Sequence, residues 1–237
     1  MDHQGHQVIE ISIDDIFPVA EGYFFSTAGF DKNNEKHRRM WSRALEVYKE
    51  IRKKAEIKAV IRYLMPEKAE GKDFYFQDVR ISCNAFERLN HDNVIGAYFY
   101  LLTAGDMQMD SEHIVDQLYS DIWGTSLVDA AQGKIRDYIS SVESAKDESG
   151  ILSAPFGPGY YGMELSQTAE FFQIIDAALV KVALSPGGMM LPQKSVTGLY
   201  LSVKDGDQLP PASCESCIGG ISGCAFCNRY DVLKNSQ

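Results

Sequence analysis

The stretch LSPGGMMLPQKSVTG, residues 184–198, contains the features that decide the fold. Alternating and apolar residues predict a strand on either side of it, over residues 180–184 and 195–203. Between these strands, Pro186, Pro192 and two adjacent glycines interrupt regular structure. The stretch therefore predicts a strand, an irregular loop rich in methionine, and a second strand.

An irregular segment, SAPFGPGYYG, lies upstream at residues 153–162. Gly159 allows the backbone to approach a ligand closely, and Tyr160 supplies a flat ring with one polar end. A helix is expected to follow over residues 164–176. The residues predicted to share one face of that helix are Leu165, Ala169, Phe172 and Ile175.

The remaining chain alternates between strand and helix patterns. Helical spacing predicts one helix over residues 33–58 and a long one opened by Ser111, and strands are expected over residues 8–13, 59–65, 74–81 and 94–103. These elements predict an α+β fold: a twisted, largely antiparallel sheet with long helices packed on it. The first helix segment carries nine Lys or Arg and four Glu, whereas residues 106–148 carry ten acids and three bases. The two oppositely charged helices are expected either to face each other or to form docking surfaces.

Length and charge narrow the class of protein. The chain has 237 residues and a net charge of −10, which predicts one large domain with an appendage and argues against nucleic-acid or anionic-membrane partners. We expect a domain over residues 1–205 and a linker with a Cys-rich tail over residues 206–237. We find no signal peptide and no membrane-spanning segment, so a cytoplasmic location is expected.

Four of the five cysteines lie close together near the C-terminus, in the pattern C-x2-C-x6-C-x2-C. Two C-x2-C pairs can complete a four-sulfur shell around a metal. Either zinc in a structural knuckle or a [4Fe–4S] cluster fits this pattern. The predicted metal ligands are Cys214, Cys217, Cys224 and Cys227. The fifth cysteine, Cys83, is predicted to be a small core or loop residue.

The two quoted segments together resemble the activation domain of vitamin B12-dependent methionine synthase and its shorter stand-alone relatives. The resemblance rests on the Pro158-Gly159-Tyr160 loop, the helix after it, and Met190-x-Pro192-x-x-Ser195-Val196-Thr197-Gly198. It is clear over residues 153–203. In this family the domain binds S-adenosylmethionine (AdoMet), approaches the corrin of cobalamin and supports reductive methylation of inactive Co(II).

The resemblance implies which residues line the AdoMet and corrin side of the domain. They are Gly157, Pro158, Gly159, Tyr160, Met189, Met190 and Pro192. Pro155 stands where the large methionine synthases have an arginine, so the bidentate donor for the AdoMet carboxylate is missing here. The Asp-x-His-x-x-Gly motif that binds cobalamin is also absent from the sequence. Cobalamin is therefore expected on a partner, a corrinoid-binding protein or B12-dependent methyltransferase.

Three functional hypotheses follow. In the first, the chain is an accessory module that reactivates a corrinoid-dependent methyltransferase, with AdoMet as methyl donor and electrons passing through an iron–sulfur cluster. In the second, it is a non-catalytic docking scaffold with structural zinc and no AdoMet. A free-standing AdoMet-dependent methyltransferase is disfavoured, because no Gly-rich turn between strand and helix is followed by the usual acid. Whether the chain is an enzyme stays open at this point.

Overall fold

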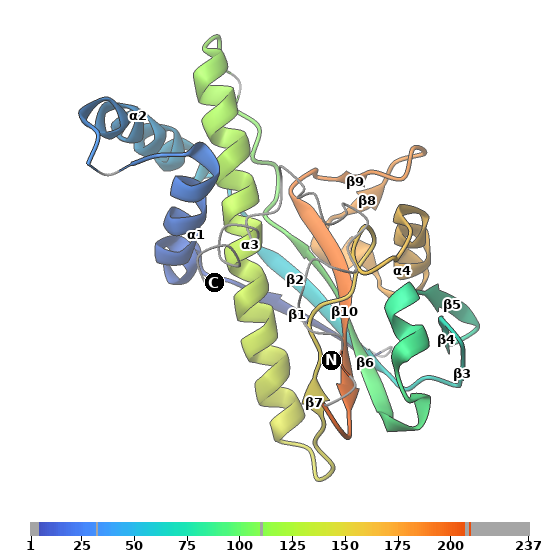
Figure 1. Ribbon diagram of the computed structural model, residues 1–237. Coiled ribbons are helices and arrows are strands. Elements are labelled where there is room, and N and C mark those ends of the chain that lie inside the picture. Colours follow the sequence, from blue (N-terminus) through green and yellow to red (C-terminus); the bar gives the residue numbers. More distant parts are fainter. Residues whose placement is uncertain (1–4, 32, 110, 207–208, 210–237) are drawn as a thin grey trace.

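The computed structural model describes residues 5–31, 33–109, 111–206 and 209 (Figure 1). An antiparallel sheet in the order β1-β2-β6-β10-β7 runs through its centre. Its strands are β1 (His6–Glu10), β2 (Lys58–Leu64), β6 (Val94–Thr103), β7 (Ile151–Leu152) and β10 (Ser195–Val203). This sheet and its long helices confirm the predicted α+β class, while the expected cysteine knuckle lies outside the described residues.

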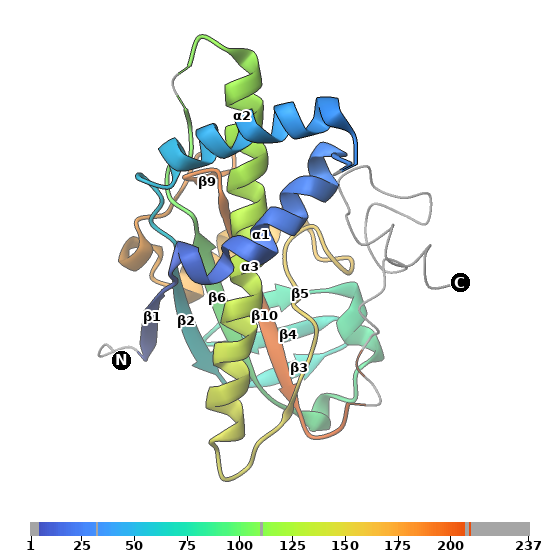
Figure 2. The same cartoon turned by 90° about the vertical axis from the view of Figure 1, so that its left-hand side faces the viewer.

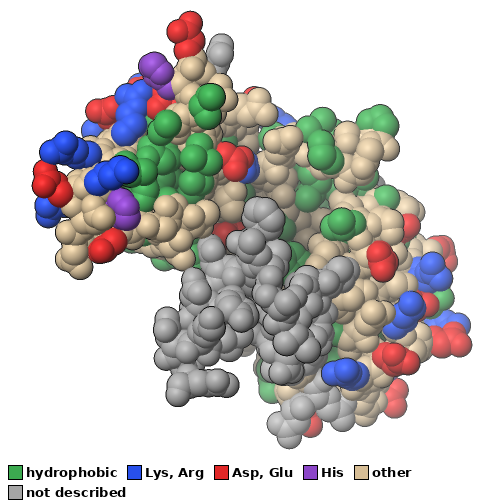
Figure 3. Space-filling view, turned by 45° about the horizontal axis from the view of Figure 1, so that its top comes forward, with side chains coloured by type: hydrophobic (Ala, Val, Ile, Leu, Met, Phe, Trp, Pro, Cys, Tyr) green, Lys and Arg blue, Asp and Glu red, His purple; other side chains and the backbone are tan. Residues whose placement is uncertain are grey.

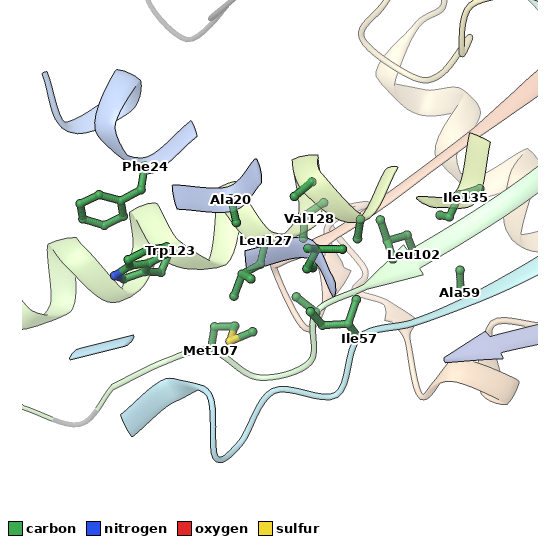
Figure 4. Close-up of a cluster of buried hydrophobic side chains, with 14 of the residues drawn as sticks. Ala20, Phe24, Ile57, Ala59, Leu102, Met107, Trp123, Leu127, Val128 and Ile135 are labelled. Atoms are coloured by element: carbon green, nitrogen blue, oxygen red, sulfur yellow. The ribbon is translucent and has the colours of Figure 1, made fainter. Parts of the chain in front are cut away.

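Three helices cover one face of the sheet (Figure 2). They are α1 (Ile13–Ala28), α2 (Glu35–Ile51) and the long α3 (Ile114–Ser144). Their apolar sides meet in a core around Trp123, which is fully buried and donates its indole N–H to the carbonyl oxygen of Ala44 at 2.9 Å. Figure 4 shows Phe24 of α1 beside Trp123, with their ring centroids 4.3 Å apart.

The opposite face of the sheet is covered by smaller elements. A three-stranded sheet contains β3 (Lys68–Glu70), β4 (Asp73–Phe76) and β5 (Val79–Ser82), and the short helix α4 (Thr168–Ile174) packs nearby. The 3-10 turns in this structure are η1 (Asn84–Arg88), η2 (His91–Asn93), η3 (Leu165–Gln167) and η4 (Ala177–Val180). Cys83 is fully buried in this second core, as predicted.

The two central strands are apolar on both faces because both faces are covered. In β6, Tyr98, Tyr100 and Leu102 join the core under the helices. The alternate residues Phe99 and Leu101 join the core on the other side. The predicted strands over residues 94–103 and 195–203 coincide with β6 and β10, because continuous apolar runs are typical of strands buried on both faces.

Several predicted elements are wrong in extent. Residues 74–81 form a hairpin rather than one strand, because Gln77 and Asp78 both adopt positive φ and turn the chain between β4 and β5. Of the strand expected over residues 180–184, Val180 ends the turn η4, which Asp176 caps by accepting from the backbone N–H of Ala178 at 3.1 Å, and Lys181 adopts a positive φ. Only Ala183–Leu184 remain extended there, as β8.

The helix expected over residues 164–176 also differs. It begins as the 3-10 turn η3 and becomes the seven-residue helix α4. The buried positions of α4 are Thr168, Phe171 and Ile174. The four residues predicted to share one face are not buried together, since Leu165 and Ala169 are exposed whereas Ile175 is buried.

The basic helix and the acidic helix pack against each other. Arg43 of α2 donates two hydrogen bonds, at 2.8 and 2.6 Å, to the buried carboxylate of Asp116 in α3. Figure 3 shows hydrophobic side chains over the α1–α2 end of the molecule, with Lys and Arg side chains around them. Among the described residues, no helix is long and apolar enough to cross a membrane.

Candidate functional site

The loop over residues 153–162 runs alongside β10 and then leaves it at Gly157. Phe156 pairs with Leu199 of β10 through two backbone hydrogen bonds of 2.9 and 2.7 Å. At Gly157 the loop is so close to β10 that a Cβ atom would lie 2.8 Å from the carbonyl oxygen of Thr197. Glycine at this position therefore permits the crossing that carries the next residues outward.

The tip of this loop is anchored at both sides and presents Tyr160 outward. Gly159, at φ +90°, and Met163 are joined by a backbone hydrogen bond of 2.9 Å. Met163 is buried, and Tyr161 is buried with its ring 5.2 Å from that of Phe156. These two anchors leave the side chain of Tyr160 55% exposed.

The methionine-rich stretch forms a small hairpin of β8 (Ala183–Leu184) and β9 (Met190–Leu191). Ser185 closes its turn, since its backbone N–H donates to the Met189 carbonyl at 2.8 Å and its hydroxyl oxygen accepts from the Met189 N–H at 3.0 Å. Met189 is 56% exposed, and Met190 is half-buried against the second core.

The loop and the hairpin meet at one cavity of about 350 Å³, the smaller cavity. Pro158 comes from the loop, and Met189 and Met190 come from the hairpin. Val196 and Thr197 contribute from β10, which runs between them. Three of the predicted site residues, far apart in the sequence, are thus brought to one place.

A second and larger cavity, of about 670 Å³, lies on the other side of the loop that joins β9 to β10. Pro192 lines this larger cavity together with Gln193, which borders both cavities. Its other walls are residues 105–109 after β6 and the first turns of α3. Gly157, Gly159 and Tyr160 line neither cavity, so they shape or flank the site rather than form its walls.

Sequence reasoning missed part of both cavities. Leu165, Thr168 and Gln193 line the smaller one, and the segment Gly105–Asp106–Met107–Gln108–Met109 lines the larger one. Gln193 lies within the motif at residues 190–198, so the motif could have indicated it. The segment after β6 has neither periodicity nor a motif, so nothing in the sequence marks it.

The walls of the smaller cavity are uncharged. None of the described residues that line it is acidic or basic. Behind it, the Thr197 hydroxyl donates to the backbone carbonyl of Tyr100 at 2.8 Å. Burial raises the pKa of Tyr100 well above its ordinary value, so this phenol stays neutral under physiological conditions. The site therefore suits an apolar surface rather than an ion.

The predicted metal ligands Cys214, Cys217, Cys224 and Cys227 all lie outside the described residues. Within the described part of the chain, no group of three or more His, Cys, Asp or Glu side chains is arranged to hold a metal ion. The metal site therefore stays a prediction from the sequence.

Comparison with known proteins places this geometry in a known fold. No family model and no curated protein matches the sequence. A search of solved structures finds a crystal structure of the MetH reactivation domain bound to AdoHcy, with a TM-score of 0.66 and 15% sequence identity. The match covers 87% of this chain and 81% of that one.

The chain has the fold of the MetH reactivation domain. The resemblance predicted from residues 153–203 is thereby confirmed at the level of fold. The MetH reactivation domain fold extends well beyond those residues, because the match covers most of the described chain. An identity of 15% leaves the roles of individual residues as proposals.

Proposed function

We propose that this chain is an accessory protein that docks on a corrinoid-binding partner and supports reductive reactivation of a cobalamin-dependent methyltransferase. One observation carries the proposal. The loop over residues 153–162 (the Gly-Tyr loop) and the β8–β9 hairpin (the methionine hairpin) meet at one apolar cavity. The fold that carries them is shared with the MetH reactivation domain.

The exposed side chains around the smaller cavity fit the face of a corrin. Leu165 and Met189, which line it, are 70% and 56% exposed, and Tyr160 stands nearby on the loop. Leu191, which lines the larger cavity, is 45% exposed. Thioether and aromatic groups provide an adaptable apolar surface for a large flat macrocycle. A partner that covers these side chains would remove apolar area from water, which favours association.

The partner's cobalamin would supply the cobalt centre at which reduction from Co(II) and methylation take place. The residues of this chain would cover the corrin face and exclude water from it. The tip that presents Tyr160 is held by the buried Tyr161 and Met163, so docking would cost little conformational entropy there.

AdoMet fits the smaller cavity less well. Its carboxylate would find no counter-charge there, because the described lining is uncharged and Pro155 replaces the family's arginine. This observation favours a second candidate function, a docking scaffold that does not bind AdoMet. Calorimetric titration of the full chain with AdoMet and with AdoHcy separates the two candidates.

The C-terminal cysteines are proposed to hold a metal, as zinc in a structural knuckle or as a [4Fe–4S] cluster that passes electrons to the cobalt. Anaerobic purification followed by iron, sulfide and zinc analysis distinguishes them. Iron with equimolar sulfide supports the redox role, whereas stoichiometric zinc supports the scaffold. A metal-free protein would exclude both proposals.

The proposed function is tested with the cobalamin domain of a methionine synthase in the Co(II) state, a reductant and AdoMet. Addition of the full chain is expected to accelerate formation of methylcobalamin, followed by visible absorption. The Met189→Ser/Leu191→Ser variant should lose this effect, because both exposed apolar groups are removed. An unchanged rate, together with no detectable binding to the corrinoid domain, would overturn the proposal.

A further inference from the structure

The strand β1 forms a long outer edge of the central sheet. In the order β1-β2-β6-β10-β7, the two outer strands are β1 and β7. The strand β7 is only two residues long, whereas β1 pairs with β2 over five consecutive residues without a register shift. Figure 2 shows β1 at the outer margin of the sheet. A regular edge strand of this length can act as a template for pairing with another chain.

The backbone of β1 directs its hydrogen-bonding groups alternately toward β2 and away from it. Just beyond the last pair of the ladder, the Ile11 N–H donates to the Ile57 carbonyl at 2.9 Å. Because the pattern alternates, Ile9 also bonds toward β2, whereas Val8 and Glu10 direct their backbone N–H and C=O groups outward. In the part of the chain that the structure describes, these outward groups have no hydrogen-bond partner.

The sequence of β1 lacks the features that usually block a free edge. Natural edge strands are protected by proline, by lysine, by a bulge or by a covering segment. The strand reads HQVIE and contains neither proline nor lysine. Its acidic residue, Glu10, is paired with Lys58 at 3.2 Å. Val8, at the middle of the strand, is 43% exposed, so an apolar side chain stands at the centre of the edge.

A second copy of the same strand fits this edge. Two antiparallel copies related by a two-fold axis at Val8 place Val8 opposite Val8 and Glu10 opposite His6. A pairing centred on Glu10 would set two carboxylates opposite each other, which is unfavourable. A pairing centred nearer the N-terminus would use less of the strand, because Gly5, at φ +79°, ends the extended backbone. The whole strand is used only when the axis lies at Val8.

The charges at the two ends of β1 are complementary in this arrangement. His6 lies opposite Arg62 of β2 in the sheet register. The guanidinium of Arg62 donates to the Ile174 carbonyl at 2.6 Å, and no carboxylate among the described residues forms an ion pair with it. Glu10 of a second copy, opposite His6, would therefore approach a cation that lacks a counter-charge. Opposite charges brought together in this way fix the register of an interface.

We propose that two copies of this chain associate through β1 and join their five-stranded sheets into one continuous antiparallel sheet. Val8 of each copy donates its N–H to the Val8 carbonyl of the other and packs against the other Val8 side chain. The proposal does not depend on the proposed function. The smaller cavity borders β10, which is separated from β1 by β2 and β6, so a dimer leaves the cavity of each copy open to a partner.

Sedimentation of the full chain under reducing conditions tests the proposal. A reversible equilibrium between monomer and dimer is expected as the concentration rises from low micromolar toward millimolar. Val8→Lys and Val8→Glu should each weaken the dimer about tenfold or more, because like charges then face each other across the axis. An equimolar mixture of the two variants should restore dimerisation, because residue 8 of one copy faces residue 8 of the other.

Two controls accompany these variants. Val19→Lys adds the same charge at a valine of α1 that is 52% exposed, and it should leave the dimer unchanged. Amide exchange followed by NMR reports on the strand itself. The Val8 and Glu10 amides should exchange more slowly as concentration rises, whereas the Ile9 amide should be slow in the monomer and in every variant that keeps β1 paired with β2.

Each other result overturns the proposal. A protein that stays monomeric at every concentration has no such interface, and a dimer that resists both Val8 variants is formed by another surface. Failure of the mixed variants to associate excludes an axis at Val8. A slow Val8 amide in a monomer would mean that another segment of the same chain covers the edge.

Discussion

The side chain of Lys194 lies across α3 at Gly124. A Cβ atom at Gly124 would lie 2.8 Å from Cγ of Lys194. The ammonium group continues to Asp121 at 2.6 Å and to the hydroxyl of Thr125 at 3.0 Å, and the Lys194 carbonyl accepts from the Ala104 N–H at 2.8 Å. Glycine at position 124 is unfavourable for the helix, but it lets Lys194 pack against α3. Lys194 thereby holds the β9–β10 loop, which separates the two cavities, against that helix.

Gly124→Ala is expected to destabilise the fold despite the better helix propensity of alanine. Alanine is favoured over glycine by about 1 kcal/mol in a helix, but its methyl group displaces the Lys194 stem and its polar contacts. Gly133→Ala is the control on the same helix, because a Cβ atom there meets nothing within 4 Å. Urea denaturation should show stabilisation by about 0.5–1 kcal/mol for Gly133→Ala and a loss for Gly124→Ala.

A double variant isolates the cause. In a Lys194→Ala background the stem is gone, so Gly124→Ala should become stabilising. If it stays destabilising there, the clash with Lys194 is not the reason for the glycine.

The stability of the fold at low pH should depend on the buried carboxylate of Glu143 and its hydrogen-bond partners. Burial alone would raise the pKa of Glu143, but hydrogen bonds from Lys146, Ser202 and Tyr98 outweigh it and lower the pKa to about 2. Since the folded pKa lies below the ordinary value of 4.5, the stabilisation is complete above that value and is lost as pH falls toward 2.

Glu143→Gln should therefore lower the free energy of unfolding by about 2–3 kcal/mol at pH 7. The difference in free energy of unfolding between the variant and the unmodified chain should shrink as pH falls from 5 to 2. Over that range the Glu143 carboxylate of the unmodified chain becomes protonated. Urea midpoints measured across this range provide the check, with Glu164→Gln, at an exposed position, as control. A penalty independent of pH would contradict the assignment.

Arg43 and Asp116 join α2 to α3, so breaking their bidentate pair should loosen α2. Hydrogen bonding from Arg43 lowers the pKa of Asp116, which keeps its buried carboxylate charged. Asp116→Asn is expected to cost about 1–3 kcal/mol. Arg39→Ala, which removes only an exposed pair with Glu35, should cost less than about 0.5 kcal/mol. Thermal unfolding of the two variants makes the comparison.

The sequence predicted those elements whose residue pattern is compatible with only one kind of secondary structure and burial. The run that became β6 is almost wholly apolar, and burial on both faces accounts for that, whereas β10 also contains the buried polar residues Thr197 and Ser202. After Asp14 and Asp15 the sequence indicates only a short turn of helix, whereas α1 continues through Pro18 to Ala28, although proline usually ends a helix. Its buried stripe of Ile16, Ala20 and Phe24 is nevertheless helical in spacing.

For the candidate site, the motif predicted that Pro158 and the methionine pair belong together, and the structure places them at one cavity. The larger cavity was not predictable. Its wall from Gly105 to Met109 is an irregular segment that becomes a wall only because β6 ends beside the β9–β10 loop, and no local pattern records that proximity.

Neighbouring tyrosines in the loop should behave in opposite ways. Tyr161 is 6% exposed and packs on Phe156, so Tyr161→Ala should lower the free energy of unfolding by about 2–4 kcal/mol. Tyr160 is 55% exposed, so Tyr160→Ala should change it by less than about 1 kcal/mol. Binding to a corrinoid-binding partner should instead weaken in Tyr160→Ala. Unchanged partner affinity would remove Tyr160 from the docking surface.

Replacing Pro155 by arginine tests whether the loop retains a place for the methyl donor. Pro155 is half-buried beside the chain that leads to Gly157, and an arginine there would introduce a guanidinium group able to pair with a carboxylate in bidentate fashion. If the AdoMet carboxylate lies against this loop, Pro155→Arg should raise AdoMet affinity about tenfold or more. Pro155→Ala controls for loss of the ring, and Pro155→Lys should gain less because its ammonium lacks the planar fork. Calorimetry on the three variants decides the point: equal affinity in all of them would mean that the carboxylate is bound elsewhere or that the chain does not take AdoMet.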